Sequence, residues 1–464
     1  MSPLARVRRR SILTSARPAI RDFLVSLTDH ERPRITRNLK LPVRISVLQR
    51  IDRWLGIPLC AVLTLIRLLL EPTIRAFRGQ VKRILFIKFA EQGSTVLAYP
   101  AIQRAVKMVG RENTYFVVFE ENRFVLDLMK ILPEENVITV ATSSLPALFI
   151  TTLWAIIQWR KLGIDAVVDL EFLTRFSAIV AFLSGAKSRV GFHTFSGGGP
   201  YRGNLMTHRL VYNPHLHTSQ MFDTMVEALS RDPRTLPTLD FTPPANQTFP
   251  KFSPLPSDAA EARSLLKQES AGLNPALLVL MNPNASDLLP LRRWPPSRYV
   301  ELARRLLAAY PQLLIGFTGG PCEADIVNRL ARDVGSRRVI PLAGKTTLRQ
   351  LVVLCSQSEI LITNDSGPAH FAWMTDCHVI TLFGPETPAL FEAKSSNVSV
   401  LWAGIACSPC VNAYNGRQSA CRNNLCMQAI TVDQVFDEAS RVLNSRLRHW
   451  RCPAKQQDLL HATI

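Results

Sequence analysis

Short, wholly apolar segments alternate with amphipathic segments along most of the chain from residue 81 onward. In the first part of this region, strands are expected at residues 81–89, 115–119, 137–140, 166–169 and 188–192. Segments with helical periodicity lie between or after them, at residues 96–109, 123–132, 147–162, 175–184 and 221–229. Strands that are apolar throughout are typical of parallel sheets with both faces covered. The alternation predicts a Rossmann-like α/β domain over residues 80–231.

The alternation resumes after residues 232–256, which are rich in Pro, Thr, Ser and Asn and show no periodicity. We interpret this stretch as an interdomain linker. Strands are then expected at residues 277–281, 313–318, 339–342, 360–363 and 378–383, with helices at 258–267, 299–310, 324–334, 348–356, 369–375 and 432–443. The sequence therefore predicts a second Rossmann-like domain over residues 257–445, followed by a tail over residues 446–464.

Residues 55–70 form a different pattern, an apolar run of 16 residues whose only charge is Arg67. On a helix, Cys60, Thr64, Arg67 and Glu71 would line up as one narrow polar stripe. The run is short for a membrane span. We expect a helix that lies in the membrane interface, with a helix packed on the protein's own core and a single span as the alternatives.

The chain is strongly basic, with 55 Lys and Arg against 36 Asp and Glu, a net charge of +19. Residues 1–50 alone hold eleven Arg and one Lys against three acids, a net of +9. We interpret residues 1–79 as a basic arm plus the interface helix. The charge favours an acidic partner, and the lack of repeats or an aromatic-rich basic stripe argues against nucleic acid, leaving anionic lipid or a phosphorylated substrate.

Candidate chemistry concentrates after the strand expected at 360–363, where Asn-Asp-Ser-Gly-Pro-Ala-His occupies residues 364–370. Free amides at the start of a helix that follows a parallel strand attract phosphate. We therefore predict a diphosphate site formed by Asp365, Ser366, Gly367 and His370, against the alternative of plain turn and cap chemistry.

Two further strand exits in the second half carry polar residues suited to a nucleotide. Asn282 ends the strand expected at 277–281, and Glu323 follows a Gly-Gly-Pro-Cys turn. We predict both as nucleotide-sugar contacts, with Glu323 placed to bond ribose hydroxyls. The alternative for Glu323 is an acid that stabilises the first turn of the next helix.

The segment 364–370, followed by Leu-Phe-Gly-Pro at 382–385, resembles glycosyltransferase family 9, the ADP-heptose:lipopolysaccharide heptosyltransferases. Residues 82–101, with Gly93 and Tyr-Pro-Ala at 99–101, resemble the first strand and loop of that family, and Arg-Arg-Trp-Pro at 292–295 resembles its Lys-x-Trp-Pro segment. The similarity covers about residues 80–445.

The resemblance implies a GT-B fold, in which two Rossmann-like domains face a cleft. It also implies an inverting transferase that moves a sugar, expected to be heptose from ADP-heptose, to a lipopolysaccharide-core or other envelope glycan acceptor. No Asp-x-Asp cluster occurs, so we expect no metal or other cofactor in catalysis. A different donor or acceptor, and a non-catalytic nucleotide-sugar or lipid-binding protein of the same fold, are the alternatives.

No signal peptide is recognisable, and nine cysteines without one favour a reducing compartment. With the resemblance, this predicts a location at the cytoplasmic face of the inner membrane, peripheral or monotopic, or in the cytoplasm.

The resemblance assigns roles with one departure. The family places its catalytic Asp directly after the loop glycine, where this chain has Ser94. A serine cannot replace a carboxylate as a base near neutral pH, so we predict that Glu91 is the base, against the alternative of a solvated loop acid. Arg292 matches the family lysine and is expected to pair with a phosphate. For the acceptor we predict contacts from four residues of the first domain: Lys88, Ser94, Arg202 and His217.

Four cysteines cluster late in the chain, at Cys407, Cys410, Cys421 and Cys426. Four thiols within twenty residues fit a structural zinc site, two disulfides or simple buried thiols. The spacing matches no known zinc finger, and zinc here would hold the loop rather than catalyse.

Overall fold

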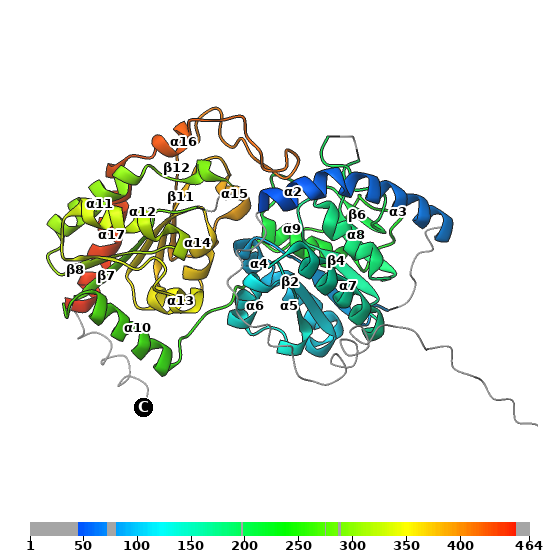
Figure 1. Cartoon of the computed structure of the whole chain (residues 1–464), viewed down its shortest axis with the longest axis horizontal. Helices are drawn as coiled ribbons and strands as arrows, with labels where there is room; N and C mark the ends of the chain where they lie inside the picture. The colour runs from blue at the N-terminus through cyan, green and yellow to red at the C-terminus, as the bar shows by residue number, and fades with distance from the viewer. Residues whose placement is uncertain (1–44, 72–79, 196–197, 274, 286–288, 452–464) are drawn as a thin grey trace, which may run out of the picture. The chain divides into compact units, whose positions relative to one another are not determined.

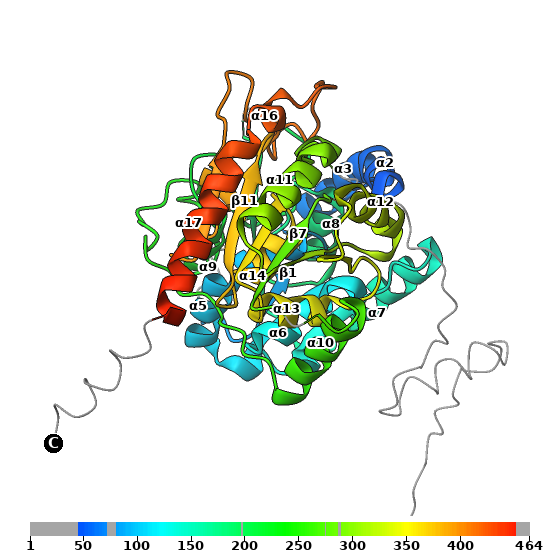
Figure 2. The ribbon, with the colours of Figure 1, turned by 90° about the vertical axis from the view of Figure 1, so that its left-hand side faces the viewer.

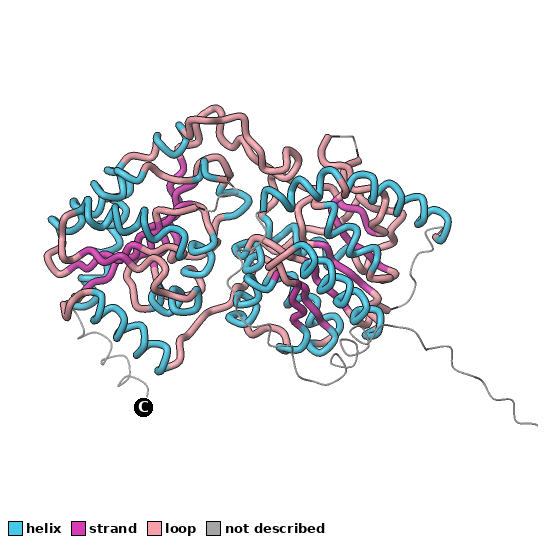
Figure 3. The backbone as a smooth tube through the Cα atoms, viewed as in Figure 1, coloured by secondary structure: helices cyan, strands magenta, loops and turns pink. Residues whose placement is uncertain are grey.

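The computed structural model describes residues 45–71, 80–195, 198–273, 275–285 and 289–451. Most of the predicted basic arm and the tail from residue 452 lie outside these ranges. Within them, two six-stranded sheets are each parallel in every strand pair. Helices surround the strands of each sheet (Figure 3), so the predicted pair of Rossmann-like sheets is confirmed.

The first sheet has the strand order β3-β2-β1-β4-β5-β6. Its strands are β1 (Ile84–Ile87), β2 (Thr114–Phe119), β3 (Val137–Val140), β4 (Ala166–Asp169), β5 (Ser188–Phe192) and β6 (His208–Leu210). Its helices are α4 (Gln92–Leu97), α5 (Tyr99–Val109), α6 (Arg123–Met129), α7 (Leu145–Leu162), α8 (Arg175–Leu183) and α9 (Thr218–Ala228) (Figure 1). The edge strand β6 was not predicted.

The second sheet has the order β12-β11-β10-β7-β8-β9. Its strands are β7 (Leu277–Asn282), β8 (Leu313–Phe317), β9 (Val339–Pro341), β10 (Ile360–Asn364), β11 (His378–Phe383) and β12 (Val398–Trp402). Its helices are α10 (Pro256–Glu269), α11 (Pro296–Ala309), α12 (Ala324–Val334), α13 (Leu348–Ser356), α14 (Gly367–Ala372), α15 (Pro388–Phe391), α16 (Leu425–Gln428) and α17 (Val432–Arg451). The helix α17 includes the start of the predicted tail. The edge strand β12 was not predicted.

The central strands form because they are mostly apolar and covered on both faces, with polar residues only at their carboxyl ends. Every residue of β1, β4, β7 and β10 is buried. In the second sheet β10 lies between β7 and β11, with Thr363 opposite Asn282 and Thr381. The parallel register brings the carboxyl ends of these three strands to one edge, where ligands of such sheets bind.

The loop around Gly93 is more helical than predicted. The helix α4 begins at Gln92 and is followed almost at once by α5, so Gly93 and Ser94 are helical residues. Glu91 precedes the helix with φ of 67°, a left-handed conformation that is uncommon outside glycine. Strain of this kind clusters at functional sites.

The apolar run that precedes the first sheet forms the helix α3 (Gly56–Leu70), and a further helix, α2 (Ile45–Trp54), comes directly before it. The predicted polar stripe faces the protein, because Cys60 and Arg67 are buried. Arg67 donates to the carbonyl of Met206 (3.1 Å) and to the side chain of Asn204 (2.9 Å). Among the described residues no single helix is long and apolar enough to cross a membrane; α2 and α3 pass only as a pair bent by 41°.

Two helices expose most of the large apolar side chains found at the surface of the described residues. Ten lie on the segment 54–70 and seven on α7, against nine elsewhere. Leu69 is 80% exposed and Phe149 is 70% exposed. Both α3 and α7 contact α8 (Figure 1 and Figure 2). This arrangement inverts the usual pattern of a water-facing helix, since its polar groups point inward and its apolar groups outward.

Candidate active site

The end of β10 organises the first part of the site. Asp365 directly follows this strand and is buried, and its Oδ2 lies 3.4 Å from Nη1 of Arg292. Asn364 accepts hydrogen bonds from the backbone N–H of Trp294 (3.0 Å) and from the hydroxyl of Tyr299 (3.1 Å). Asn364 therefore fixes the Arg-Arg-Trp-Pro segment and so holds Arg292 beside Asp365.

The predicted helix after this turn is α14, which has only six residues. Ser366 occupies its N-cap, but no side-chain capping bond forms, and Ser366 Oγ lies instead 3.2 Å from Thr363 Oγ1. The expected capping by a side-chain oxygen is therefore not found for Ser366. A helix this short has a small dipole, so the positive charge here comes mainly from Arg292, and His370 adds a neutral ring that can donate one N–H.

His370 packs directly on the loop of the first half. A Cβ added at Gly93 would overlap the imidazole ring, so only glycine permits this close approach. Burial lowers the pKa of His370 to about 4; Asp365 opposes this effect and Arg292 adds to it. The ring is therefore neutral at pH 7, and its buried Nδ1 has no hydrogen-bond partner among the described residues.

Glu91 lies at the centre of a second group of charges. Lys88 Nζ lies 3.1 Å from Glu91 Oε2, and Ser94 Oγ donates to the same oxygen at 3.2 Å. Nη1 of Arg417 contacts the other oxygen, Glu91 Oε1. Burial alone would raise the pKa of Glu91, but Arg417 and then Lys88 outweigh it and lower the pKa to about 2. Glu91 is therefore ionised at neutral pH.

Lys88 is fully buried and pairs with a second acid as well as with Glu91. Its Nζ lies 3.1 Å from Oε2 of Glu171, whose Oε1 accepts from the backbone N–H groups of Phe89 (2.7 Å) and Ala90 (3.1 Å). Burial opposes a charge on Lys88, but Glu171 and Glu91 outweigh it and raise its pKa. Glu171 thus holds both the lysine and the backbone that precedes Glu91.

Arg417 comes from the loop between β12 and α16, the loop that carries the four cysteines. Its guanidinium carbon lies 5.1 Å from the ring centre of Phe172 and 5.2 Å from that of Phe391. On the same loop, the ring centre of Tyr414 lies 5.3 Å from that of Tyr212 in the first half. These contacts place a cation of the second half against Glu91 of the first.

Glu386 is the second acid that Arg417 approaches, with 3.6 Å between Arg417 Nε and Glu386 Oε1. It follows β11 and is 2% exposed. Burial raises its pKa to about 7, against the opposing effect of Arg417. We call Glu91, Asp365, Glu386, Arg292 and Arg417 the carboxylate–arginine cluster.

Three buried polar atoms in or beside this cluster have no hydrogen-bond partner among the described residues: Glu386 Oε2, Arg292 Nε and His370 Nδ1. Arg292 and Asp365 act electrostatically on both Glu386 and His370, so the three atoms belong to one neighbourhood. Buried polar groups are nearly always paired in native proteins. A polar ligand with both donors and acceptors would complete this site.

Four other predicted residues are engaged by the protein itself. Arg202 pairs with buried Asp169, and His217 hydrogen-bonds to Ser219 Oγ (2.7 Å) and to the carbonyl oxygen of Glu392 (2.9 Å). Asn282 hydrogen-bonds to Thr363 and Asn284, and Glu323 accepts from the N–H of Gly320 (2.7 Å). The bond between Glu323 and Gly320 holds the turn that precedes α12, and the ligand contacts of all four stay predictions.

The four cysteines of the late cluster are free thiols in this structure. Cys426 is buried, Cys410 is half-buried, and Cys407 and Cys421 are exposed. Cys410 Sγ lies 3.2 Å from Ser419 Oγ. Among the described residues no three His, Cys, Asp or Glu side chains are arranged to hold a metal ion. Two disulfides are therefore not formed here, and the structural zinc stays a prediction.

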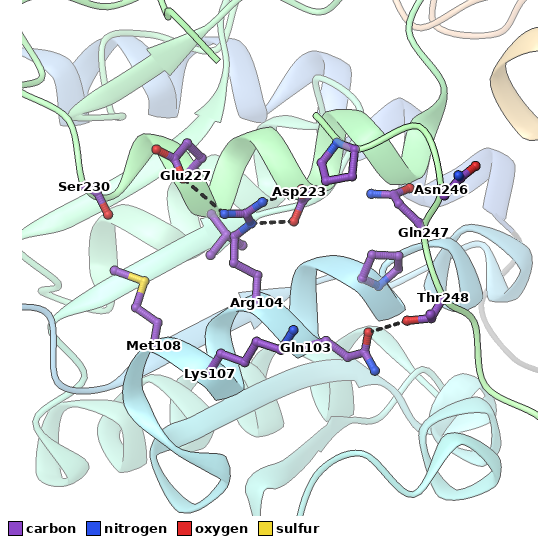
Figure 4. Close-up of a pocket in the computed structure, with 13 residues that line it drawn as sticks. Gln103, Arg104, Lys107, Met108, Asp223, Glu227, Ser230, Asn246, Gln247 and Thr248 are labelled. Carbon is purple, nitrogen blue, oxygen red and sulfur yellow. Dashed lines mark hydrogen bonds and ion pairs between the residues drawn. The ribbon is translucent and has the colours of Figure 1, made fainter. Parts of the chain in front are cut away.

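A separate surface pocket lies between α5, α9 and residues 244–248 (Figure 4). Its floor is Arg104, which pairs with Asp223 (2.6 Å) and Glu227 (3.2 Å). Gln103 bridges to Thr248 at 3.0 Å. The lining shares no residue with the carboxylate–arginine cluster. Because Arg104, Asp223 and Glu227 already pair with each other, we do not assign it a ligand.

Comparison with known protein families identifies the chain. The model of glycosyltransferase family 9 (heptosyltransferase) matches residues 158–420, more than half of the sequence. The chain belongs to glycosyltransferase family 9. The matched region includes β10, α14, Glu386 and Arg417, and it ends just before Cys421.

Individual family members match over shorter regions. Lipooligosaccharide heptosyltransferase 2 of Campylobacter jejuni is 26% identical over 173 residues, which are 36% of this chain and 51% of that protein. Lipopolysaccharide heptosyltransferase 2 of Salmonella typhimurium is 32% identical over 115 residues, 24% of this chain and 32% of that protein. The chain thus spans about half or less of the length of these curated relatives.

Solved structures of the family share the fold over a longer range. The structure of Escherichia coli ADP-heptose lipopolysaccharide heptosyltransferase II superposes with a TM-score of 0.60 at 17% identity, covering 78% of this chain and 99% of that one. An Escherichia coli heptosyltransferase with ADP gives 0.52 at 18% identity, with 78% and 99% covered. At such identities the similarity shows the two-sheet family fold.

Two residues of the cluster were not predicted from the sequence, Glu386 and Arg417. Glu386 directly follows the Gly-Pro that ends the family-like segment, and β11 is the neighbour of β10, so its place at the strand exit was a usable signal. Arg417 carries no such signal, because its loop has no regular structure and 326 residues separate it from Glu91.

Proposed function

We propose that this family 9 chain is an inverting, metal-independent glycosyltransferase that moves heptose from ADP-heptose to a lipopolysaccharide-core or other cell-envelope glycan acceptor. Family membership and the similarity to heptosyltransferases support the reaction class. The observation that carries the site is the set of three buried, unpaired polar atoms on Glu386, Arg292 and His370. They match a ligand with phosphate acceptors and hydroxyl donors.

The departing diphosphate would be held by the cationic side of the site. Arg292 has a free Nε that can donate to a phosphate oxygen, and its Nη1 already rests on Asp365. His370, neutral at pH 7, donates one N–H, and the amides near Gly367 add to it. Arginine binds phosphate without deprotonating. These donors balance the leaving-group charge in a mechanism that needs no metal.

Glu91 is the proposed base that takes the proton from the acceptor hydroxyl. It is ionised, and Lys88 and Ser94 hold its Oε2 while Arg417 holds its Oε1. Ser94, which stands where the family has Asp, thus orients the replacement carboxylate in this proposal. A carboxylate paired this strongly is a weak base, so the contact with Arg417 must loosen when the substrates bind.

The enzyme attaches to the cytoplasmic face of the inner membrane in this proposal. The exposed apolar faces of α3 and α7 would enter the interface, and the exposed Arg53 next to α3 would meet anionic headgroups. Both helices contact α8, so one approach to a bilayer can use both. Attachment here would bring the active site close to a lipid-linked acceptor.

The decisive experiment is transfer by the Glu91→Gln variant. With ADP-heptose and a heptose-free lipid-linked core acceptor, the variant should lose most product while its affinity for ADP stays within about twofold, because only the proton acceptor is removed. The matched control is Glu120→Gln, an exposed acid that precedes α6. Full turnover by Glu91→Gln would refute the assignment.

Because Ser94 stands where the family has its catalytic Asp, a transferase with a different donor and a non-catalytic nucleotide-sugar-binding protein are the alternative functions. Product formation with a panel of ADP-, UDP- and GDP-linked sugars separates these functions. Turnover with a UDP- or GDP-sugar alone would identify another donor, whereas nucleotide binding without any product would identify a binder.

A further inference from the structure

Glu386 is buried in a way that the diphosphate site does not explain. Its side chain is 2% exposed, its Oε1 reaches Arg417 only at 3.6 Å, and its Oε2 has no partner among the described residues. A buried charged group left without hydrogen bonds costs stability, and native proteins rarely retain one without a use. A group that is absent here would supply the donor.

The neighbouring charges indicate which group that is. A phosphate oxygen beside the carboxylate of Glu386 would be repelled, and Asp365 and Glu91 add negative potential that Arg417 and Arg292 offset. The phosphates therefore fit better at the unpaired polar atoms of Arg292 and His370. What Glu386 can accept is a neutral donor, such as a hydroxyl.

The position of Glu386 within the cluster indicates whether the hydroxyl that it binds belongs to the donor sugar or to the nucleoside. Arg417 contacts both Glu386 and Glu91, so Glu386 lies one side chain away from the proposed base. The anomeric carbon must lie between the diphosphate and the acceptor hydroxyl that the base activates. The part of the donor nearest to Glu91 is therefore the sugar and not the adenosine.

We propose that Glu386 binds hydroxyl groups of the donor sugar and so determines which sugar is accepted. This inference rests on the proposed function and adds a specificity residue to the same site. Glu386 exchanges no proton with the substrate in this role, and its Oε2 accepts one or two sugar O–H donors. A site built to bond a hydroxyl discriminates strongly against sugars that lack it.

The test compares ADP, which lacks the heptose, with ADP-heptose by calorimetry on the full chain. In Glu386→Ala we expect the affinity for ADP-heptose to fall roughly 10- to 100-fold, the value of a hydrogen bond to a charged group, while the affinity for ADP stays within about twofold. Glu386→Gln, which keeps the shape and one acceptor oxygen, should show a smaller loss. Glu359→Gln, at the opposite end of β10 and paired with Arg446, is the matched control and should bind both ligands as the wild type does.

The pH dependence gives a second readout that a merely structural residue would not move. Hydroxyl donors bind the ionised carboxylate best, so in the wild type the ratio of ADP-heptose to ADP affinity should rise between pH 6 and pH 8, around the pKa of about 7. In Glu386→Gln the ratio should be flat.

Three outcomes would overturn the inference. Unchanged affinity for ADP-heptose in Glu386→Ala would show that Glu386 does not contact the sugar. An equal loss of affinity for ADP and ADP-heptose would show that Glu386 acts on the diphosphate or stabilises the fold. Failure of the wild type to bind either ligand would refute the proposed function itself, and that result is distinct because it does not depend on a variant.

Discussion

Truncation of Arg417 tests whether the carboxylate–arginine cluster controls the protonation of the base. Arg417 is the largest favourable influence on the charge of Glu91, whose pKa is about 2. In Arg417→Ala the charge of Glu91 keeps Lys88, the hydroxyl of Ser94 and the weaker effect of Arg292, while burial continues to oppose it. The pKa of Glu91 must therefore rise.

The size of the effect follows from the geometry. At an effective dielectric constant of about 20, a cation about 3–4 Å from a carboxylate stabilises its charge by about 4–5 kcal/mol, or about 3 pH units. Water that enters the vacated space will screen the remaining charges, so we expect a rise of about 1–3 units. Leaving Glu386 without its cation should also cost about 3–5 kcal/mol of folding stability, as for other broken buried pairs.

The assay is kcat/KM against pH, which reports the ionisation of the free enzyme. The wild type should show no acid limb from Glu91 above about pH 3, and Arg417→Ala should show one at about pH 3–5. Arg417→Lys keeps the charge without the planar guanidinium and should lie between them. The control is Arg422→Ala, an exposed arginine of the same loop. If Arg417→Ala folds and its acid limb coincides with that of the wild type, Arg417 does not set the charge of Glu91.

Three further predictions address packing, linkage and attachment. Gly93→Ala would place a Cβ into the imidazole ring of His370, so it should lower the free energy of unfolding by about 1–3 kcal/mol in denaturant titrations and reduce kcat in activity assays. The control Gly198→Ala, which has open space around it, should change neither quantity. Burial raises the pKa of Glu386 from 4.5 to about 7, so its folded state holds the proton more tightly. The contribution of Glu386 to stability is therefore present below pH 4.5 and is lost as the pH rises through about 7. Between pH 4.5 and pH 8 the free energy of unfolding of Glu386→Gln, from urea titrations, should gain on the order of 3 kcal/mol relative to that of the wild type. A difference that stays constant with pH would contradict this linkage. Leu69→Glu should lower the affinity for phosphatidylcholine–phosphatidylglycerol vesicles about tenfold or more in a sedimentation assay, because burying a leucine side chain is worth about 2 kcal/mol. The control Ile326→Glu, on α12, should bind as the wild type does. Binding by Leu69→Glu equal to that of the wild type would show that α3 does not enter the interface.

The sequence alone determined most of the architecture because the information for parallel strands is local. Strands buried on both faces must be apolar throughout, and β1, β4, β7 and β10 can be located on that pattern alone. The turn after β10 is equally local, since Asp365 and Gly367 belong to one short stretch whose spacing is typical of the family. Two of the four edge strands were missed, β6 because it has only three residues and β12 because it is only partly buried.

The direction of the apolar helix was decided by tertiary contacts. Periodicity grouped Cys60, Thr64 and Arg67 on one face but could not say which way that face points. The carbonyl oxygens near Met206 supply the acceptors that Arg67 needs, so the polar stripe turns inward and the apolar face outward.

The charge environment of the active site was also beyond the sequence. Glu91 was predicted as the base from its place near Gly93, but nothing local showed that Arg417, 326 residues away, would contact it. Glu386 became part of the same site only because β11 pairs with β10 and the cysteine-bearing loop returns to meet both. Local patterns specify strands and turns, whereas a cluster of opposite charges exists only where the folded chain brings distant side chains together and excludes water from them.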